Sequence, residues 1–246
     1  MNIDLYLTPM PLNRANLENK TVAIIDVLRF CTSTCAALMV GAKGVIPTIG
    51  PGEAVEMWTK LGGDVAVLAG ERGGLKIENF PLGNSPAEFT EESVGGRFIV
   101  MTTTNGSGVF SKTYNADLVV CCALVNVSRV AASIAETDRN LAIVCSGQEG
   151  GFSIEDTICG GMLIHLLTAE HKKEVTLNDA SSLALLLYQT NWTAIKKTIQ
   201  QGEHARHLAE LGFAGDVEIA ARIDTMPVLP VLKEGRLVPK GEPGHD

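Results

Sequence analysis

The residues best suited to chemistry in this sequence are carboxylates and guanidinium groups that stand close together in two short segments. Asp26 is followed three residues later by Arg29, and Glu71 is followed directly by Arg72 within the glycine-rich run of residues 70–74. A carboxylate can bind a metal ion or act as a nucleophile, and a guanidinium group can bind two oxygens of an anion at once. The two segments indicate a site for an anionic substrate. The alternative is a pair of structural turns whose charges are paired or solvated.

Two further segments add hydroxyl groups and acidic groups. Residues 102–108 read Thr-Thr-Thr-Asn-Gly-Ser-Gly, and backbone N–H groups at the start of a helix suit phosphate or sulfonate oxygens. This segment lacks the spacing and the lysine of a Walker A loop. Glu155 and Asp156 stand at the start of another expected helix, where acidic groups either favour the helix dipole or bind a cation together with Asp26 and Glu71.

The elements that must position these segments follow from the hydrophobic pattern. Apolar runs predict strands at residues 22–25, 45–46, 65–68, 98–101, 118–121 and 141–145. Helical spacing predicts helices at residues 32–40, 53–61, 106–113, 127–136 and 156–169. This alternation predicts an α/β fold, with a mostly parallel sheet and helices on both faces. Because ligands bind at the carboxyl ends of the strands in such sheets, we expect the four polar segments to meet at one edge.

The C-terminal part of the chain has a different pattern, since the spacing is helical throughout residues 177–221. We therefore expect an α/β core over residues 1–172 that carries the active-site loops. A C-terminal helical portion over residues 173–246 would pack on this core, either as a second unit or as part of one continuous domain.

Composition narrows the class of protein. The chain has 246 residues, of which 46% are hydrophobic, so it can bury a core. Its formal net charge of −8 argues against nucleic acid as the main partner. The sequence has no apolar run of about 18 residues and no basic leader, so we expect a cytoplasmic protein without a membrane partner. The sequence does not determine the oligomeric state, and it is compatible with a homo-oligomer.

Cysteines and histidines offer other reactive groups. None of the six cysteines forms a C-x-x-C pair, so buried, reduced thiols are the expectation. Cys31 is the cysteine best placed for activation, because it lies two residues after Arg29. His204 and His207 have i, i+3 spacing, and we expect both on a solvated helix surface.

Five segments in chain order resemble the 2-phosphosulfolactate phosphatase family: residues 26–29, 70–74, 83–89, 102–106 and 155–161. The resemblance implies a Mg²⁺-dependent phosphoric monoester hydrolase. It implies conversion of 2-phospho-3-sulfolactate, or a related phosphorylated 2-hydroxy acid, to 3-sulfolactate and phosphate, a step in coenzyme M biosynthesis. The partner would be this small anionic phosphoester.

Combined with the resemblance, the residue types give each segment an expected role. The expected catalytic groups are Asp26, Glu71 and Asp156. The expected Mg²⁺ ligands are Asp26, Glu71, Glu155 and Asp156. The expected substrate-binding residues are Arg29, Arg72, Asn84, Ser85, Thr103, Thr104, Asn105 and Gly106. Whether the phosphoryl group passes to an aspartate, to a cysteine or directly to water is left open.

Two other functions remain as alternatives. One is a cysteine hydrolase of the isochorismatase-like type, in which Asp26 would assist Cys121 or Cys145. The other is a non-catalytic module that binds a phosphorylated metabolite through the same loops.

Overall fold

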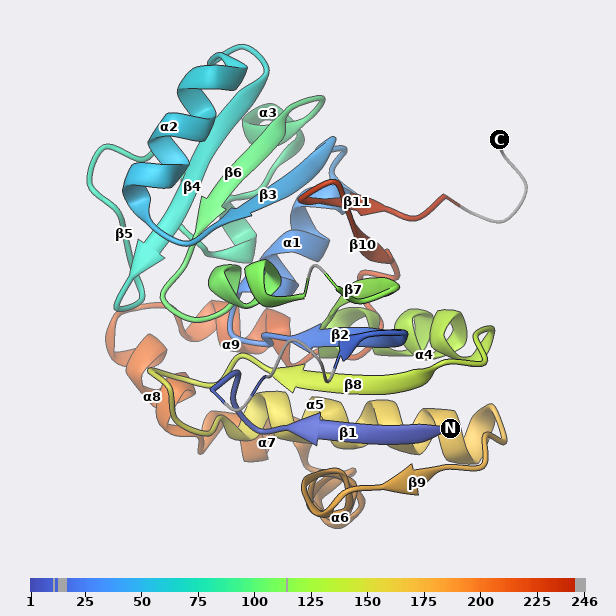
Figure 1. The fold of residues 1–246 in the computed structure, drawn as a ribbon. Helices are drawn as coiled ribbons and strands as arrows, with labels where there is room; N and C mark the ends of the chain where they lie inside the picture. The colour runs from blue at the N-terminus through green and yellow to red at the C-terminus, as the bar shows by residue number, and fades with distance from the viewer. Residues whose placement is uncertain (11, 13–16, 114, 242–246) are drawn as a thin grey trace.

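A computed structural model describes residues 1–10, 12, 17–113 and 115–241 of the chain (Figure 1). Its strands are β1 (Asn2–Tyr6), β2 (Lys20–Ile25), β3 (Gly44–Thr48), β4 (Ala66–Arg72), β5 (Leu75–Lys76), β6 (Phe98–Thr102), β7 (Leu118–Cys122), β8 (Asn140–Cys145), β9 (Thr176–Leu177), β10 (Pro230–Lys233) and β11 (Arg236–Pro239). Its α-helices are α1 (Phe30–Met39), α2 (Pro51–Leu61), α3 (Glu91–Val94), α4 (Val127–Ala135), α5 (Ile154–His165), α6 (Asp179–Asn191), α7 (Ile195–Gln200), α8 (Glu203–Glu210) and α9 (Ala214–Ala220). Short 3₁₀ turns occupy Pro86–Glu88, Ser107–Lys112 and Leu124–Asn126, and a π-helical turn, Leu166–Glu170, extends α5.

The described strands form one sheet in the order β5-β4-β6-β3-β11-β10-β7-β2-β8-β1-β9. It contains two parallel blocks, β4-β6-β3 and β7-β2-β8-β1, so the predicted mostly parallel α/β fold is confirmed. The sequence pattern did not predict the antiparallel hairpin β10–β11 between the blocks, which pairs Val231 with Val120 and Leu237 with Val45. Figure 1 shows the arrowheads of both blocks converging on one side of the molecule.

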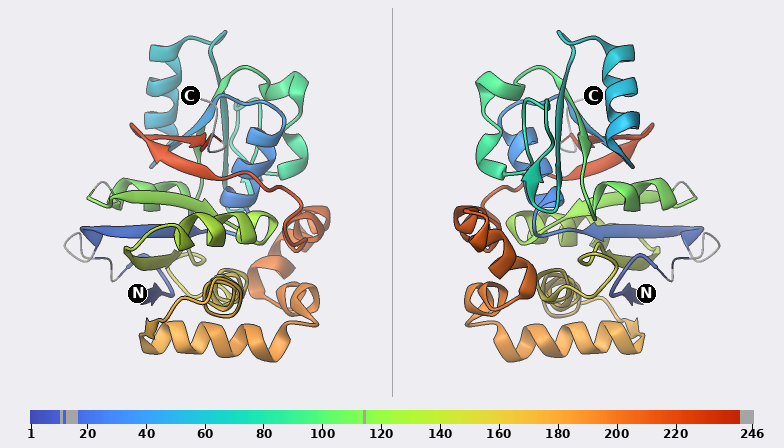
Figure 2. Two further views of the ribbon diagram at one scale, coloured as in Figure 1. Left: turned by 90° about the vertical axis from the view of Figure 1, so that its right-hand side faces the viewer. Right: turned by 90° about the vertical axis from the view of Figure 1, so that its left-hand side faces the viewer.

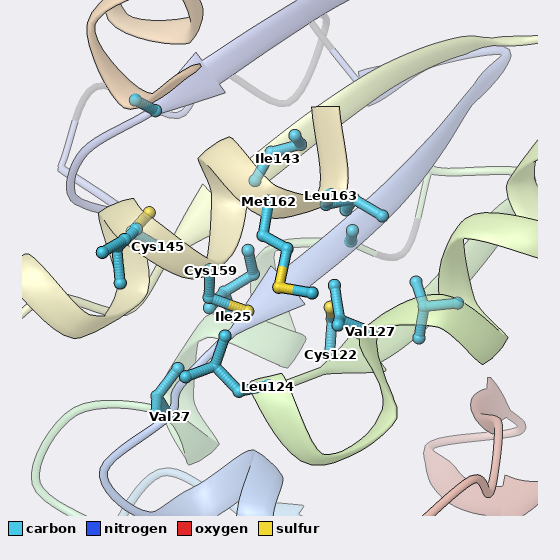
Figure 3. Packing of buried hydrophobic residues seen from close by; sticks show 14 of the residues in the cluster. Ile25, Val27, Cys122, Leu124, Val127, Ile143, Cys145, Cys159, Met162 and Leu163 are labelled. Atoms are coloured by element: carbon cyan, nitrogen blue, oxygen red, sulfur yellow. The ribbon is translucent and has the colours of Figure 1, made fainter. Parts of the chain in front are cut away.

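Alternate residues of the central strands pack into separate hydrophobic clusters on the two faces of the sheet. In β2, Ala23 and Ile25 join the cluster that includes α4 and α5, whereas Val22 and Ile24 join the cluster that includes α1. Figure 3 shows the first cluster, with side chains of α5 against β2, β7 and β8. Because both faces are covered by helices, these strands are continuous apolar runs, as expected for buried parallel strands.

The boundaries of one site-bearing strand differ from the prediction. Strand β4 runs through Glu71 and Arg72 instead of ending before Gly70, because Gly70 is still paired with Thr102 of β6. A Cβ atom on Gly70 would collide with the Thr102 carbonyl, so glycine allows this close pairing. The chain then turns at Gly73 and Gly74, which both have positive φ. Glu71 and Arg72 are therefore held on a strand.

The predicted helical C-terminal part is present as α6 to α9. Figure 2 shows α6 beside α5 at the end of the sheet and the later helices, orange to red, along one side of the molecule. Helices α5 and α6 pack closely, since a Cβ atom on Gly161 would collide with the Ala184 carbonyl. After α9 the chain returns to the sheet as β10 and β11. The proposed boundary between residues 172 and 173 stays a prediction, and residues 242–246 of that portion lie outside the described residues. Among the described helices, none has the length and apolar character needed to cross a membrane.

Candidate active site

A polar pocket lies where the carboxyl ends of β2, β4, β6 and β8 approach α8. It brings together seven of the predicted site residues, namely Asp26, Arg29, Glu71, Asn84, Thr103, Thr104 and Asn105. Gln148, Glu149, His204 and His207 also line it. The predicted residues Arg72, Ser85, Gly106, Glu155 and Asp156 are not among the described residues that line this pocket. The expectation that the polar segments meet at one edge is thus confirmed for most of their residues.

Asp26 is buried at the end of β2, with 2% of its surface exposed. Its Oδ1 accepts a hydrogen bond of 3.0 Å from the backbone N–H of Phe30 in the first turn of α1. Burial raises the pKa of this carboxyl group from 3.8 to about 6, because desolvation outweighs the opposing effects of His204 and of the Phe30 N–H. The charge of Glu71 raises the pKa of Asp26 further. The surroundings of Asp26 in the pocket therefore disfavour the charged form of its carboxyl group.

Gly106 sets the space available to the Asp26 carboxylate. A Cβ atom on Gly106 would collide with Asp26 Oδ2 and lie 2.9 Å from Phe30 Cβ, whereas a Cβ atom on Gly108 would meet nothing within 4 Å. The backbone of Gly106 is right-handed helical, with φ −70° and ψ −44°, so alanine is allowed there by its backbone angles. Gly106 thus acts by leaving room and not by its conformational freedom.

We predict that Gly106→Ala displaces the Asp26 carboxylate and lowers kcat at least tenfold, a loss of the kind expected when a reacting group moves by about 1 Å. Gly108→Ala, two residues away within the 3₁₀ turn that follows Gly106, is the matched control and should keep nearly full activity. Steady-state assays of the two variants check this. Equal activities would show that the contact between residue 106 and Asp26 is unimportant.

Glu71 links the turn after β4 to the loop after β6. Its Oε1 accepts a 2.7 Å hydrogen bond from the Thr104 N–H, and its Oε2 accepts hydrogen bonds from the Gly74 N–H at 2.8 Å and the Thr104 hydroxyl at 3.1 Å. Thr103 and Ser107 exchange N–H to hydroxyl hydrogen bonds of 2.9 and 3.0 Å. The N–H groups of Thr103 and Thr104, expected to bind an oxyanion, are thus bound within the protein.

Arg29 lines the pocket at the start of α1. It also forms a buried ion pair that the sequence analysis did not predict. Its Nη1 donates to Asp216 Oδ2 at 2.7 Å, its Nη2 donates to the Gly74 carbonyl at 2.7 Å, and its guanidinium lies 4.6 Å from the centre of the Phe213 ring. Ser85 donates a 2.6 Å hydrogen bond to the other Asp216 oxygen. Ser85 therefore holds Asp216 instead of lining the pocket. The available signal for this ion pair was Asp216 itself, an acidic residue in the first turn of a helix.

The side chains of two further predicted residues form hydrogen bonds with other groups of the protein. Arg72 donates to the Thr102 hydroxyl at 2.9 Å and to the Glu71 carbonyl at 2.6 Å, outside the pocket lining. Asp156 accepts hydrogen bonds from the N–H of Val27 at 2.8 Å, from the Ser146 hydroxyl at 3.0 Å and from the Gly147 N–H at 3.1 Å. Burial raises the pKa of Asp156 well above its usual value. Asp156 therefore joins the loop after β2 to the loop after β8.

The expectation of a solvated surface for His204 and His207 is wrong, because α8 packs over the pocket and directs both residues to it. His204 Nδ1 lies 3.1 Å from Oε1 of the buried Glu155. His207 Nε2 lies 3.2 Å from the Gly73 carbonyl oxygen. The i, i+3 spacing was the available signal, but it does not reveal what the helix packs against.

The oxygen atoms in the pocket suit a hard cation. Within the described part of the chain, no three His, Cys, Asp or Glu side chains gather at one point, so the four predicted Mg²⁺ ligands are not assembled. Asp26 and Glu71 do share the pocket with Asn84, whose buried Oδ1 has no hydrogen-bond partner among the described residues. Mg²⁺ in proteins is commonly held by one or two carboxylates and retains several waters. These three residues fit such a site, whereas Glu155 and Asp156 are not among the described residues that line the pocket.

The cysteines do not form a nucleophilic site. All six are buried and free, and none is among the described residues that line the pocket. Burial raises the pKa of five of these thiols, namely Cys31, Cys35, Cys121, Cys145 and Cys159. Because the thiolate is the reactive form, these groups are poor nucleophiles. A cysteine hydrolase is therefore not favoured.

The chain is similar to known proteins over nearly its whole length. The model of the "2-phosphosulpholactate phosphatase" family matches residues 6–235. A relative from Caldanaerobacter subterraneus subsp. tengcongensis, named "Probable 2-phosphosulfolactate phosphatase", is 36% identical over 235 residues, which cover 96% of this chain and 97% of the relative. A relative of the same name from Clostridium acetobutylicum is 35% identical over 238 residues, or 97% of this chain and 100% of the relative. A third, from Carboxydothermus hydrogenoformans, is 35% identical over 240 residues and 97% of both chains.

Proposed function

The chain belongs to the 2-phosphosulfolactate phosphatase family, and on that premise we propose that it is a Mg²⁺-dependent enzyme of coenzyme M biosynthesis. As a member of the family it is a phosphoric monoester hydrolase. Its proposed reaction is hydrolysis of 2-phospho-3-sulfolactate, or of a related phosphorylated 2-hydroxy acid, to the free hydroxy acid and phosphate. The main support from the site is that Asp26, Glu71 and Asn84 line one pocket beside Arg29, and that Asn84 Oδ1 has no hydrogen-bond partner within the described part of the chain.

The charges around the pocket support the need for a cation. Asp26 and Glu71 are both acidic, and the charge of Arg29 is already paired with Asp216. A dianionic phosphoester would be repelled by such a lining. Mg²⁺ held by Asp26, Glu71 and Asn84 Oδ1 would supply the positive charge that phosphoryl oxygens need.

The protein's own groups would orient the ester. Arg29 is fixed by Asp216, by the Gly74 carbonyl and by Phe213, so its remaining N–H donors form a rigid site for an anionic oxygen of the substrate. We assign to Asp26 the central catalytic role, close to the phosphorus atom. Thr103, Thr104 and Asn105 would line the opposite side of the substrate.

The other predicted residues are assigned supporting roles. Asp156 would hold the loops after β2 and β8 at a fixed separation, and Ser85 would fix Asp216 behind Arg29. Gly106 would leave room for the Asp26 carboxylate. We assign no contact with substrate to Arg72, because its guanidinium is bound to Thr102 and to the backbone.

The test is release of inorganic phosphate from racemic phosphosulfolactate and from a panel of phosphorylated 2-hydroxy acids, each with Mg²⁺ and with EDTA. We expect release with Mg²⁺, a loss of at least a hundredfold in EDTA, and recovery when Mg²⁺ is restored. Equal rates in Mg²⁺ and in EDTA would contradict the metal requirement. Absence of release from every ester by folded protein would overturn the proposed substrate class and favour the non-catalytic binding module.

A further inference from the structure

A histidine and a buried carboxylate form a pair at the edge of the pocket that has no role in the function proposed above. His204, in the first turn of α8, directs Nδ1 to Oε1 of Glu155 at a distance of 3.1 Å. The side chains are 12% and 2% exposed, respectively. Since Nδ1 is held by Glu155, Nε2 is the ring nitrogen left to interact with a bound ligand.

The position of the pair is fixed by close packing between the turn before α8 and the start of α5. A Cβ atom on Gly202, which precedes α8, would lie 2.9 Å from Ile154 Cγ2 and 3.4 Å from Glu155 Oε2. Ala205 and Leu208, on the inner face of α8, are buried in the main hydrophobic cluster. The imidazole is therefore presented by a rigid helix, as a group that must meet a reacting atom requires.

His204 and Asp26 come from different parts of the fold, α8 and the loop after β2. Both residues line the same pocket. An ester whose phosphorus atom lies near Asp26 would thus have the imidazole within reach of another of its oxygens. A carboxylate bound to Nδ1 orients the ring, the arrangement that serves acid–base catalysis in other hydrolases.

The proposed reaction needs a general acid, because its leaving group is an alkoxide. The leaving group of a phosphorylated 2-hydroxy acid is a strongly basic alkoxide, and general acid catalysis contributes about 10²–10⁴-fold to steps of this kind. An activated ester such as p-nitrophenyl phosphate releases a weakly basic oxygen and needs no proton. Alkyl and activated esters can therefore distinguish an acid from a residue that only binds phosphate.

We infer that His204 is the general acid that protonates the leaving oxygen, and that Glu155 is its positioning residue. This inference rests on the proposed phosphatase function. The bond between phosphorus and the leaving oxygen breaks with its electron pair on that oxygen, and the Nε2 proton passes there to form the free hydroxy acid. Water supplies the oxygen for the new bond to phosphorus, and one of its protons restores Nε2–H.

The experiment compares His204→Gln with the wild type on phosphosulfolactate or another alkyl ester and on two activated compounds, p-nitrophenyl phosphate and acetyl phosphate. We expect kcat to fall about 10²–10⁴-fold on the alkyl ester and less than tenfold on the activated compounds. Glu155→Gln should give the same selectivity with a smaller loss. Glu210→Gln, at the exposed end of α8, controls for a change of charge on the helix.

A second readout does not depend on activated compounds. Added imidazole should restore part of the alkyl-ester activity of His204→Ala, since it can supply the missing proton. Equal losses on all esters together with no rescue, in variants whose thermal transition is unchanged, would overturn the role of His204 as an acid. If the wild type releases no phosphate from any ester, the proposed function itself fails, and the two failures are thereby distinguished.

Discussion

Replacement of Asp26 by asparagine should abolish phosphate release and, above pH 6, make the protein more stable. Asparagine has nearly the same shape, and its Oδ1 can still accept the hydrogen bond from the Phe30 N–H. It carries no charge, so it binds a cation more weakly than the carboxylate does, and it cannot act as a base or nucleophile at phosphorus. We expect kcat to fall by roughly 10³-fold or more, the size of loss seen when a central catalytic group is removed.

The gain in stability follows from the raised pKa of Asp26. Its pKa is about 6 in the folded protein and 3.8 when exposed, so ionisation inside the fold costs about 3 kcal/mol. Because the folded state binds the proton more tightly, the stability of the wild type falls as pH rises from about 4 to about 6. Asp26→Asn lacks this dependence. Its advantage should be greatest above pH 6 and should disappear below about pH 4.

Thermal unfolding in EDTA between pH 4 and pH 8, combined with phosphate-release assays, checks both effects. Asp64→Asn, at an exposed aspartate, is the matched control and should change neither activity nor the pH profile of stability. An Asp26→Asn protein that unfolds at a lower temperature than the wild type at pH 7 would contradict this account. It would instead assign Asp26 a mainly structural role.

Replacement of Arg29 by methionine is expected to remove about 3–5 kcal/mol of the free energy of unfolding, because it leaves the charge of Asp216 buried and unpaired. The two side chains are 3% and 5% exposed and meet at 2.7 Å. Activity should be lost as well, since Arg29 is the one arginine among the described residues that line the pocket.

The double variant Arg29→Met/Asp216→Asn separates the two effects. Removing both charges should restore much of the stability without restoring activity, and a double-mutant cycle by urea denaturation measures the coupling. Lys60→Met, which removes the exposed partner of Glu56 on α2, is the control and should change stability by less than about 1 kcal/mol. Purely additive losses at Arg29 and Asp216 would contradict the ion pair as the source of the effect.

The sequence alone determined the fold class and most of the pocket. Strands β2, β6 and β8 are apolar runs followed directly by Asp26, Thr103 and Ser146. Their periodicity and the polar residues that follow them placed three loops at one edge of a parallel sheet. These signals are local, because a buried strand and the turn that ends it are encoded by adjacent residues. The family resemblance rests on the same segments and is confirmed by the family match.

Only the tertiary structure decided which polar groups remain available to a ligand. Arg72, Ser85 and Asp156 have side-chain types suited to binding, but their partners are distant in the sequence: Ser85 bonds Asp216, and Asp156 bonds Val27. Hydrogen bonds between residues so far apart along the chain leave no periodic pattern in the sequence. The same is true of His204, which lines the pocket because the turn before α8 packs against the start of α5. Residue type and spacing thus identified the site, whereas long-range packing determined which side chains of that site bind the protein and which can meet a substrate.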